Sequence, residues 1–133
     1  MPNDKRLTPV EWEIMDSIWK LDGSPSVREV LENAFPNGEK AYTTIQTVMN
    51  TLVKKNVLKI EKIGLVNFYS PTKSRDEVIQ TEMNQIVSRV FSGSIPAMAN
   101  YLFKSKDFGI NEIEQIKKLL DQRENELNGQ NHD

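Results

Sequence analysis

The hydrophobic period of this sequence changes near Asn56, and that change limits the folds that the chain can adopt. Before it, apolar residues recur every three or four positions in three short segments, which predicts three amphipathic helices. These segments are LTPVEWEIMDSIWKLDG at 7–23, SVREVLENAF at 26–35 and AYTTIQTVMNTLVKKN at 41–56. After it, LKIEKI at 58–63 alternates between apolar and charged residues, which predicts a strand.

The residues that follow complete a predicted β-hairpin. Leu58, Ile60 and Ile63 are expected to face inward, with the charged residues of the same strand facing outward. Gly64-Leu65-Val66 supplies the turn, and NFYSP at 67–71 forms the second strand. Three short helices followed by a hairpin are the layout of a winged helix-turn-helix.

Capping residues mark where the helices begin. Thr8 with Glu11 three positions later has the pattern of a capping box, and Gly23 ends the first helix. Either Ser24 or Ser26 is expected to cap the second helix.

The third helical segment joins an apolar face to an unusually polar one. Its apolar face carries Ile45, Val48, Met49 and Leu52. Threonine loses side-chain freedom in a helix, so a face selected only for helix stability would use Glu, Lys, Gln or Ala instead. Thr, Asn and Gln side chains hydrogen-bond to base edges and phosphates without adding negative charge, which favours a DNA-recognition helix. The alternative interpretation is a tolerated polar surface that faces solvent.

The residues expected to contact DNA follow from this interpretation. The start of the helix would meet the groove first, and its two terminal lysines would lie near a phosphate strand. The candidate residues are Tyr42, Thr43, Thr44, Gln46, Thr47, Asn50, Thr51, Lys54 and Lys55.

Charge is distributed unevenly along the chain, whose formal net charge is −2. Residues 40–75 hold seven basic side chains and one acidic side chain, a balance of +6, whereas the segments on either side are each −4. A basic segment in an acidic protein is a candidate phosphate-binding surface. A solvated basic face without a partner is the other interpretation.

The rest of the chain predicts a second unit of three helices. Ser74 is expected to cap the first, Gly93 and Pro96 to interrupt, a short helix to cover 97–103, and Asn111 to cap the last. Three helices of about sixty residues are near the lower limit for an independent core, so their apolar stripes are expected to pack against a second copy. The expected dimer-interface residues are Ile79, Met83, Ile86, Val90, Met98, Leu102, Ile113, Ile116 and Leu120. The alternative is that these helices fold back on the winged helix in a monomer.

The predicted fold class is therefore mainly α with a small β-hairpin: a winged helix-turn-helix followed by a three-helix dimerisation region. We expect a DNA-binding domain at 1–73, a helical dimerisation domain at 74–128 and a disordered tail at 129–133.

Composition excludes several classes of site. The chain has no cysteine, which excludes disulfides, thiolate metal sites and cysteine nucleophiles, and its single histidine is His132. We expect no cofactor, no metal and no catalysis, because Glu11, Glu13 and Asp16 have the spacing of an exposed, solvated helix face. Apolar stretches are far shorter than the roughly 20 residues that cross a bilayer, and MPNDKRLTP lacks the apolar core of a signal peptide, so a cytoplasmic protein without membrane insertion is expected.

Over nearly its whole length the chain resembles the penicillinase-repressor family of bacterial regulators (BlaI/MecI type). The resemblance rests on LTPVEWEIMDSIW, YTTIQTVMNTLVKKNVL, the hairpin end NFYSP, and FSGSIPAMANYLF with the leucine-rich last helix. It implies a homodimeric repressor with an N-terminal winged helix, bound to palindromic operators in double-stranded DNA. It adds Lys62 and Asn67, which flank the wing tip, to the DNA-contacting residues.

This sequence departs from the family pattern at several positions. Family members often carry a basic residue in place of Thr51 and a Pro-Lys pair in place of Tyr42 and Thr43, so the operator sequence is not transferable. The turn at 64–66 is apolar, which weakens the case for a charged wing contact.

The family resemblance also suggests how the repressor is released. In the best-known members a membrane-bound sensor of β-lactam antibiotics triggers cleavage at an Asn-Phe bond, so a membrane sensor or a protease acting in trans is a candidate partner. The nearest match here is Asn100-Tyr101, although alignment from Gly93 puts Tyr101 at the asparagine position. Copper-responsive relatives use C-terminal cysteines, which this chain lacks.

Two further alternatives stay open. A small-ligand-sensing winged-helix regulator would need a cavity between the C-terminal helices, and Met83, Met98, Tyr101, Phe103 and Phe108 could line one, although such residues more often form a core. A winged helix used only for protein contacts would not need the basic segment.

Overall fold

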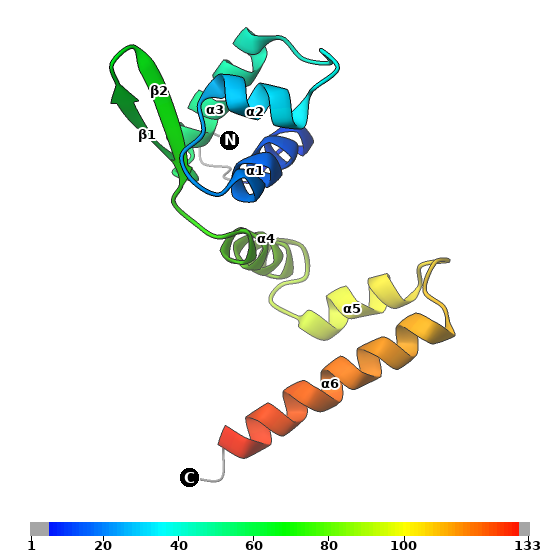
Figure 1. Cartoon of the computed structure of the whole chain (residues 1–133). Helices are drawn as coiled ribbons and strands as arrows, with labels where there is room; N and C mark the ends of the chain where they lie inside the picture. The colour runs from blue at the N-terminus through cyan, green and yellow to red at the C-terminus, as the bar shows by residue number, and fades with distance from the viewer. Residues whose placement is uncertain (1–5, 131–133) are drawn as a thin grey trace. The chain divides into compact units, whose positions relative to one another are not determined.

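The computed structural model describes residues 6–130, which form six helices and one two-stranded sheet (Figure 1). The chain divides into two compact units, residues 1–84 and 85–133. The first unit contains α1 (Pro9–Leu21), α2 (Val27–Ala34), α3 (Tyr42–Lys54), β1 (Leu58–Ile63) and β2 (Val66–Pro71). The remaining helices are α4 (Arg75–Val90), which begins in the first unit and ends in the second, α5 (Ile95–Phe103) and α6 (Ile110–Gln130). The predicted winged helix-turn-helix followed by three helices is confirmed.

Reciprocal capping boxes begin three of the helices. In each, a Ser or Thr hydroxyl accepts a backbone N–H three residues later, and the Glu at that position accepts the N–H of the cap. The pairs are Thr8–Glu11, Ser26–Glu29 and Ser74–Glu77. The predicted caps at Thr8 and Ser74 are confirmed, and of the two candidates for α2 it is Ser26 that caps.

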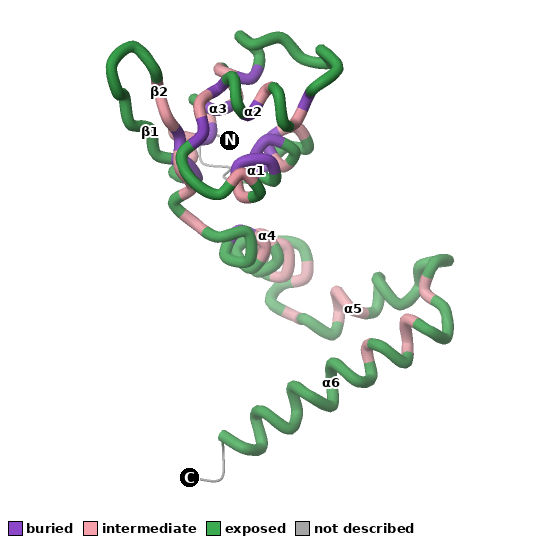
Figure 2. The backbone as a smooth tube through the Cα atoms, in the orientation of Figure 1, coloured by how far each residue is buried: buried purple, intermediate pink, exposed green. Residues whose placement is uncertain are grey.

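The core of the first unit lies where α1, α2 and α3 meet (Figure 2). Ile14, Ile18, Val30 and Met49 have no exposed surface. At about 1.5–3 kcal/mol for each fully buried aliphatic side chain, this cluster supplies the main stabilisation of the helical body. Tyr69 of β2 is also fully buried, which joins the base of the hairpin to the helices.

The hairpin is less buried than its alternation predicted. Strands β1 and β2 pair antiparallel, and the Ile63–Val66 pair leaves Gly64 and Leu65 as a two-residue turn, so Val66 belongs to the strand and not to the turn. Leu58 at the base is buried, but Ile60 and Ile63 are 42% and 60% exposed, so their predicted inward orientation is wrong. Alternation assigns residues to the two faces of a strand, yet in the described chain no second layer covers the tip of this hairpin.

Two predicted helix starts in the second unit move. Helix α5 begins at Ile95, where Ser94 Oγ accepts the N–H of Ala97 at 3.1 Å. Pro96 therefore lies in the first turn, where its missing N–H costs nothing, and does not interrupt. Helix α6 begins before the expected cap Asn111.

The expected tail and the expected domain boundary also change. Helix α6 continues through Gln130, past the start of the tail expected at 129, and residues 131–133 with His132 lie outside the described residues. The first unit extends beyond 73 because Val78 of α4 joins its buried core. Arg75 strengthens this attachment, since its Nε lies 3.0 Å from Asp16 Oδ1 and its guanidinium lies over the Trp12 ring.

A buried ion pair ties the start of α1 to the end of α3. Lys55 Nζ lies 2.7 Å from Glu11 Oε1, and the two side chains are 19% and 4% exposed. The same ammonium group donates to the Arg6 carbonyl oxygen at 3.0 Å. The prediction that Glu11 faces solvent is wrong, because this carboxylate both caps α1 and neutralises Lys55.

Replacing Lys55 should therefore destabilise the fold. Lys55→Ala leaves the Glu11 carboxylate buried without its counter-ion, and we expect a loss of about 3 kcal/mol in the free energy of unfolding. Lys54→Ala, which removes an exposed side chain one residue earlier, should change the free energy of unfolding by less than about 0.5 kcal/mol. Urea unfolding followed by circular dichroism compares the two variants, and equal midpoints would show that the pair contributes no net stability.

Candidate nucleic-acid interface

Helix α3 has one buried face and one exposed polar face. Ile45, Met49 and Leu52 are fully buried against the other helices. Of the candidate contact residues on this helix, Gln46 and Thr51 are half-buried, and the exposed ones are Tyr42, Thr43, Thr44, Thr47, Asn50 and Lys54. The predicted division of this helix into an apolar and a polar face is confirmed.

The start of α3 differs from the starts of α1 and α2. Its N-cap is Ala41, which offers no side-chain acceptor. The first backbone N–H groups of the helix are therefore left to water or to an external acceptor, at the end where the helix dipole is positive. Within the helix, the Thr51 hydroxyl donates to the Thr47 carbonyl oxygen at 3.0 Å, so this threonine is already engaged.

A tyrosine from the hairpin contacts the polar face of α3. The Tyr69 hydroxyl donates to Asn50 Oδ1 at 2.8 Å, although the two residues come from β2 and α3. Burial, followed by the nearby Tyr42, raises the pKa of the Tyr69 hydroxyl, and a side-chain hydrogen bond with Asn67 acts in the opposite direction. The hydroxyl therefore stays protonated at neutral pH and remains a hydrogen-bond donor.

The two terminal lysines of the candidate set have different surroundings. Lys54 is exposed and makes no ion pair among the described residues. Lys55 is held by Glu11 inside the fold, so its ammonium group is not free to reach a phosphate without breaking that pair.

A groove lies between the hairpin tip and the starts of α2 and α3. Its volume is about 350 Å³, and the residues that line it are Ser26, Val27, Arg28, Tyr42, Gln46, Leu65, Val66 and Asn67. The groove thus brings together three of the predicted contact residues, Tyr42, Gln46 and Asn67, whereas Lys62 lies on the exposed partner strand opposite Asn67.

Arg28 is the candidate that sequence reasoning missed. Its guanidinium lies over the ring of Tyr42, 5.4 Å from the centroid, which holds a positive charge beside the start of α3. Because Arg28 belongs to an acidic stretch of sequence, net charge by segment hid it. Its exposed position in the first turn of α2, two residues after the capping Ser26, was the available signal.

The wing tip is apolar, as the sequence indicated. Leu65 is 96% exposed, and Ile63 and Val66 beside it are also exposed. Lys59 and Lys62 on β1 are exposed as well, so charge lies along the strand and not at its tip.

The second unit has almost no interior of its own. Neither α5 nor α6 contains a buried residue (Figure 2). Among the expected interface residues, Met83, Val90, Leu102 and Leu120 are exposed. The others are half-buried: Ile79, Ile86, Met98, Ile113 and Ile116.

An open apolar groove of about 430 Å³ runs between the end of α5 and the first half of α6. It is lined in part by Leu102, Phe108, Ile116 and Leu119. Of the side chains suggested for a ligand cavity, only Phe108 lines this groove, with Phe103 stacked on it at 5.0 Å.

Within residues 6–130, no cluster of three or more His, Cys, Asp or Glu side chains could hold a metal ion. In the same part of the chain, the helices are too short or too polar to cross a membrane.

Comparison with known proteins connects these features to a family. The penicillinase repressor of Bacillus licheniformis is 25% identical over 120 residues, which are 90% of this chain and 93% of that protein. The transcriptional regulator BlaI of Mycobacterium tuberculosis is 27% identical over 115 residues, 86% of this chain and 83% of its own length. A solution structure of monomeric B. licheniformis BlaI with the blaP half-operator shares 31% identity, covers 53% of this chain and 85% of that one, and has a TM-score of 0.45. The penicillinase repressor family model matches residues 7–122, and the chain belongs to this family.

Proposed function

We propose that this protein is a cytoplasmic transcriptional repressor that binds palindromic operator DNA as a homodimer. It represses by occupying the operator and catalyses no reaction. The observation that carries the proposal is the exposed polar face of α3, which is held rigidly from behind by three fully buried apolar side chains. Membership of the penicillinase repressor family supports it.

The surface chemistry suits a duplex. Short polar side chains on α3 can hydrogen-bond to base edges, and threonine methyl groups can pack on thymine methyl groups. These side chains are Thr43, Thr44, Gln46 and Thr47. The basic segment 40–75 supplies charge for phosphates on either side of the groove. Arg28 adds a cation next to the first residue of the recognition helix.

Dimerisation is proposed from the lack of a core in the second unit. Leu119 and Leu120 of α6 are 63% and 61% exposed. Other large apolar side chains of α5 and α6 are also exposed. An exposed apolar stripe is unfavourable in water. A second copy of the chain would cover it, and a symmetric operator would require the same partner.

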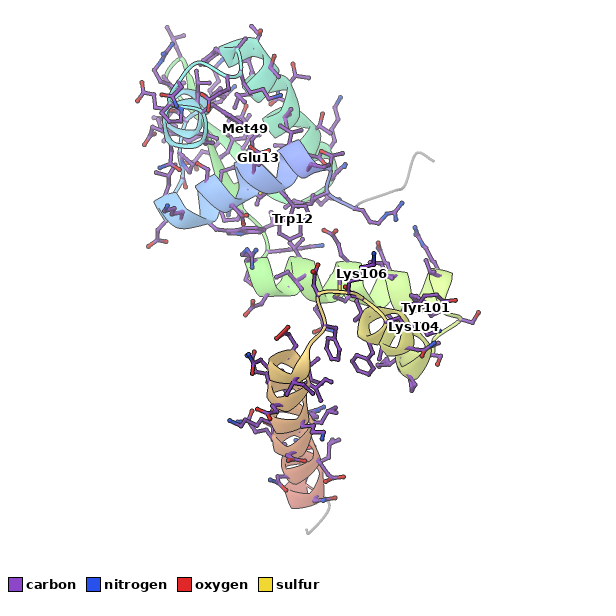
Figure 3. All side chains as sticks on the ribbon, turned by 90° about the vertical axis from the view of Figure 1, so that its right-hand side faces the viewer. Trp12, Glu13, Met49, Tyr101, Lys104 and Lys106 are labelled. Atoms are coloured by element: carbon purple, nitrogen blue, oxygen red, sulfur yellow. The ribbon has the colours of Figure 1, made fainter. Side chains whose placement is uncertain are left out.

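The proposal includes release of the repressor by proteolysis within α5. Asn100 and Tyr101 are exposed residues of α5, and the Lys104 ammonium lies 5.6 Å from the Tyr101 ring centroid (Figure 3). Because the bond lies inside a helix, a protease would have to unwind this turn before cutting.

Removing one exposed phosphate contact should weaken binding to all DNA sequences alike. For Lys54→Ala we expect the slope of log affinity against log salt concentration to fall by about 1, with base preference unchanged. Fluorescence anisotropy on duplexes from the upstream region of the gene and on scrambled duplexes measures both quantities. Lys20→Ala, at the end of α1, is the control; an equal effect of both substitutions would argue against a specific role for Lys54.

A charge on the apolar stripe of α6 should separate the two copies. We expect Leu120→Asp to raise the dimer dissociation constant at least about tenfold, since a carboxylate would have to be buried without a partner. Lys118→Asp, on the opposite face by helical periodicity, should leave it unchanged. Sedimentation equilibrium distinguishes the two, and a wild-type chain that is monomeric at high micromolar concentration would contradict the proposal.

Cleavage has a direct readout. In cells exposed to a β-lactam, cutting at the proposed bond gives a fragment that ends at Asn100, while Asn100→Ala should remain intact under the same treatment. Intact-mass spectrometry of the purified chain detects it. If operator release occurs without that fragment, the bond is not the release point.

A further inference from the structure

The contact between Tyr69 and Asn50 determines which part of the Asn50 amide faces outward. Tyr69 is fully buried, and its hydroxyl donates to Asn50 Oδ1 at 2.8 Å. The amide is planar, with its oxygen and nitrogen on opposite branches. An oxygen directed at the buried hydroxyl leaves the Nδ2 group, with its two N–H donors, on the open side.

This orientation matters because asparagine can read bases in two ways. Recognition of adenine uses both the oxygen, as acceptor, and the nitrogen, as donor. An asparagine whose oxygen is directed at the buried tyrosine presents mainly its N–H donors outward, which suits O6 of guanine or O4 of thymine. Adenine carries an N6–H donor in place of O6 and is disfavoured.

We propose that Tyr69 is a positioning residue that makes Asn50 a hydrogen-bond donor to a guanine or thymine acceptor, and disfavours adenine at that position. This inference rests on the proposed function, since it names the base that one residue of the recognition helix would read.

The tyrosine side of this contact is fixed by packing. Its ring lies in the core of the first unit, so its hydroxyl cannot follow the amide if the amide rotates. Asn67 of the wing acts on the pKa of the same hydroxyl in the lowering direction, against the larger effect of burial, and also lines the groove beside α3. The hydroxyl therefore lies close to one residue of the wing and donates to one residue of the recognition helix.

The test is selection of binding sites from a random duplex library by the full-length protein. We compare the parent with Asn50→Ala and Tyr69→Phe, which removes only the hydroxyl and keeps the buried ring. Tyr101→Phe, which removes the same atom from the second unit, is the matched control. Thermal unfolding of each variant confirms that it is folded.

We expect the parent to prefer guanine or thymine over adenine at one position of each half-site. Asn50→Ala should relax this preference about tenfold. Tyr69→Phe should relax the same position by roughly two- to tenfold, with all other positions and the affinity for scrambled DNA unchanged. Tyr101→Phe should match the parent throughout.

A base analogue tests the inference without any change in the protein. If guanine is selected, 6-thioguanine at that position replaces O6 with the weaker acceptor sulfur and should weaken the parent but not Asn50→Ala. If thymine is selected, 4-thiothymine replaces O4 and should have the same selective effect.

Three results would overturn the inference while leaving the repressor proposal intact. They are a preference for adenine at the position that depends on Asn50, a Tyr69→Phe profile identical to the parent, and an equal loss on all sequences for Asn50→Ala, which would indicate a phosphate contact. A parent protein that selects no sequence at all would instead overturn the proposed function, and the inference with it.

Discussion

The burial of one face of α3 is the constraint on which the rest of the first unit depends. Ile45, Met49 and Leu52 have no exposed surface, and the helices on either side pack against them. This packing stabilises the helix by tertiary contact, so its outer face does not need residues of high helix propensity. The threonines that would weaken an isolated helix are therefore tolerated here, and the surface is free to be selected for what it binds.

Much of this unit could be predicted from the sequence, for physical reasons that are local. Capping pairs such as Thr8 with Glu11 span three residues, and helical periodicity assigns Ile45 and Met49 to the core without knowledge of the partners. The errors came where a residue's surroundings are decided at long range. Ile60 alternates correctly with Leu58 but has nothing above it, and Ile63 falls on the opposite face of the strand. Glu11 lies in the first turn of a helix but meets Lys55, which is 44 residues away in the sequence.

The candidate site shows the same limit. Residue type was enough to select the polar face of α3, because the chemistry of Thr, Gln and Asn does not depend on the neighbours. It was not enough to distinguish Lys54 from Lys55, two adjacent lysines of which one is exposed and the other lies in a buried pair. Nor could it find the Tyr69–Asn50 hydrogen bond or the Arg28–Tyr42 contact, since each joins elements that the sequence separates and the hairpin or the helical turn brings together.

The absence of a buried residue in α5 and α6 has a consequence for how the protein would respond to its own abundance. If two copies supply each other's interior, the stability of this half is not a fixed property of the chain but increases with the number of molecules in the cell. Operator occupancy would then depend on roughly the square of protein concentration near the dissociation constant. A modest change in the synthesis or degradation of this protein would therefore switch the promoter between repression and expression more sharply than a monomeric repressor could.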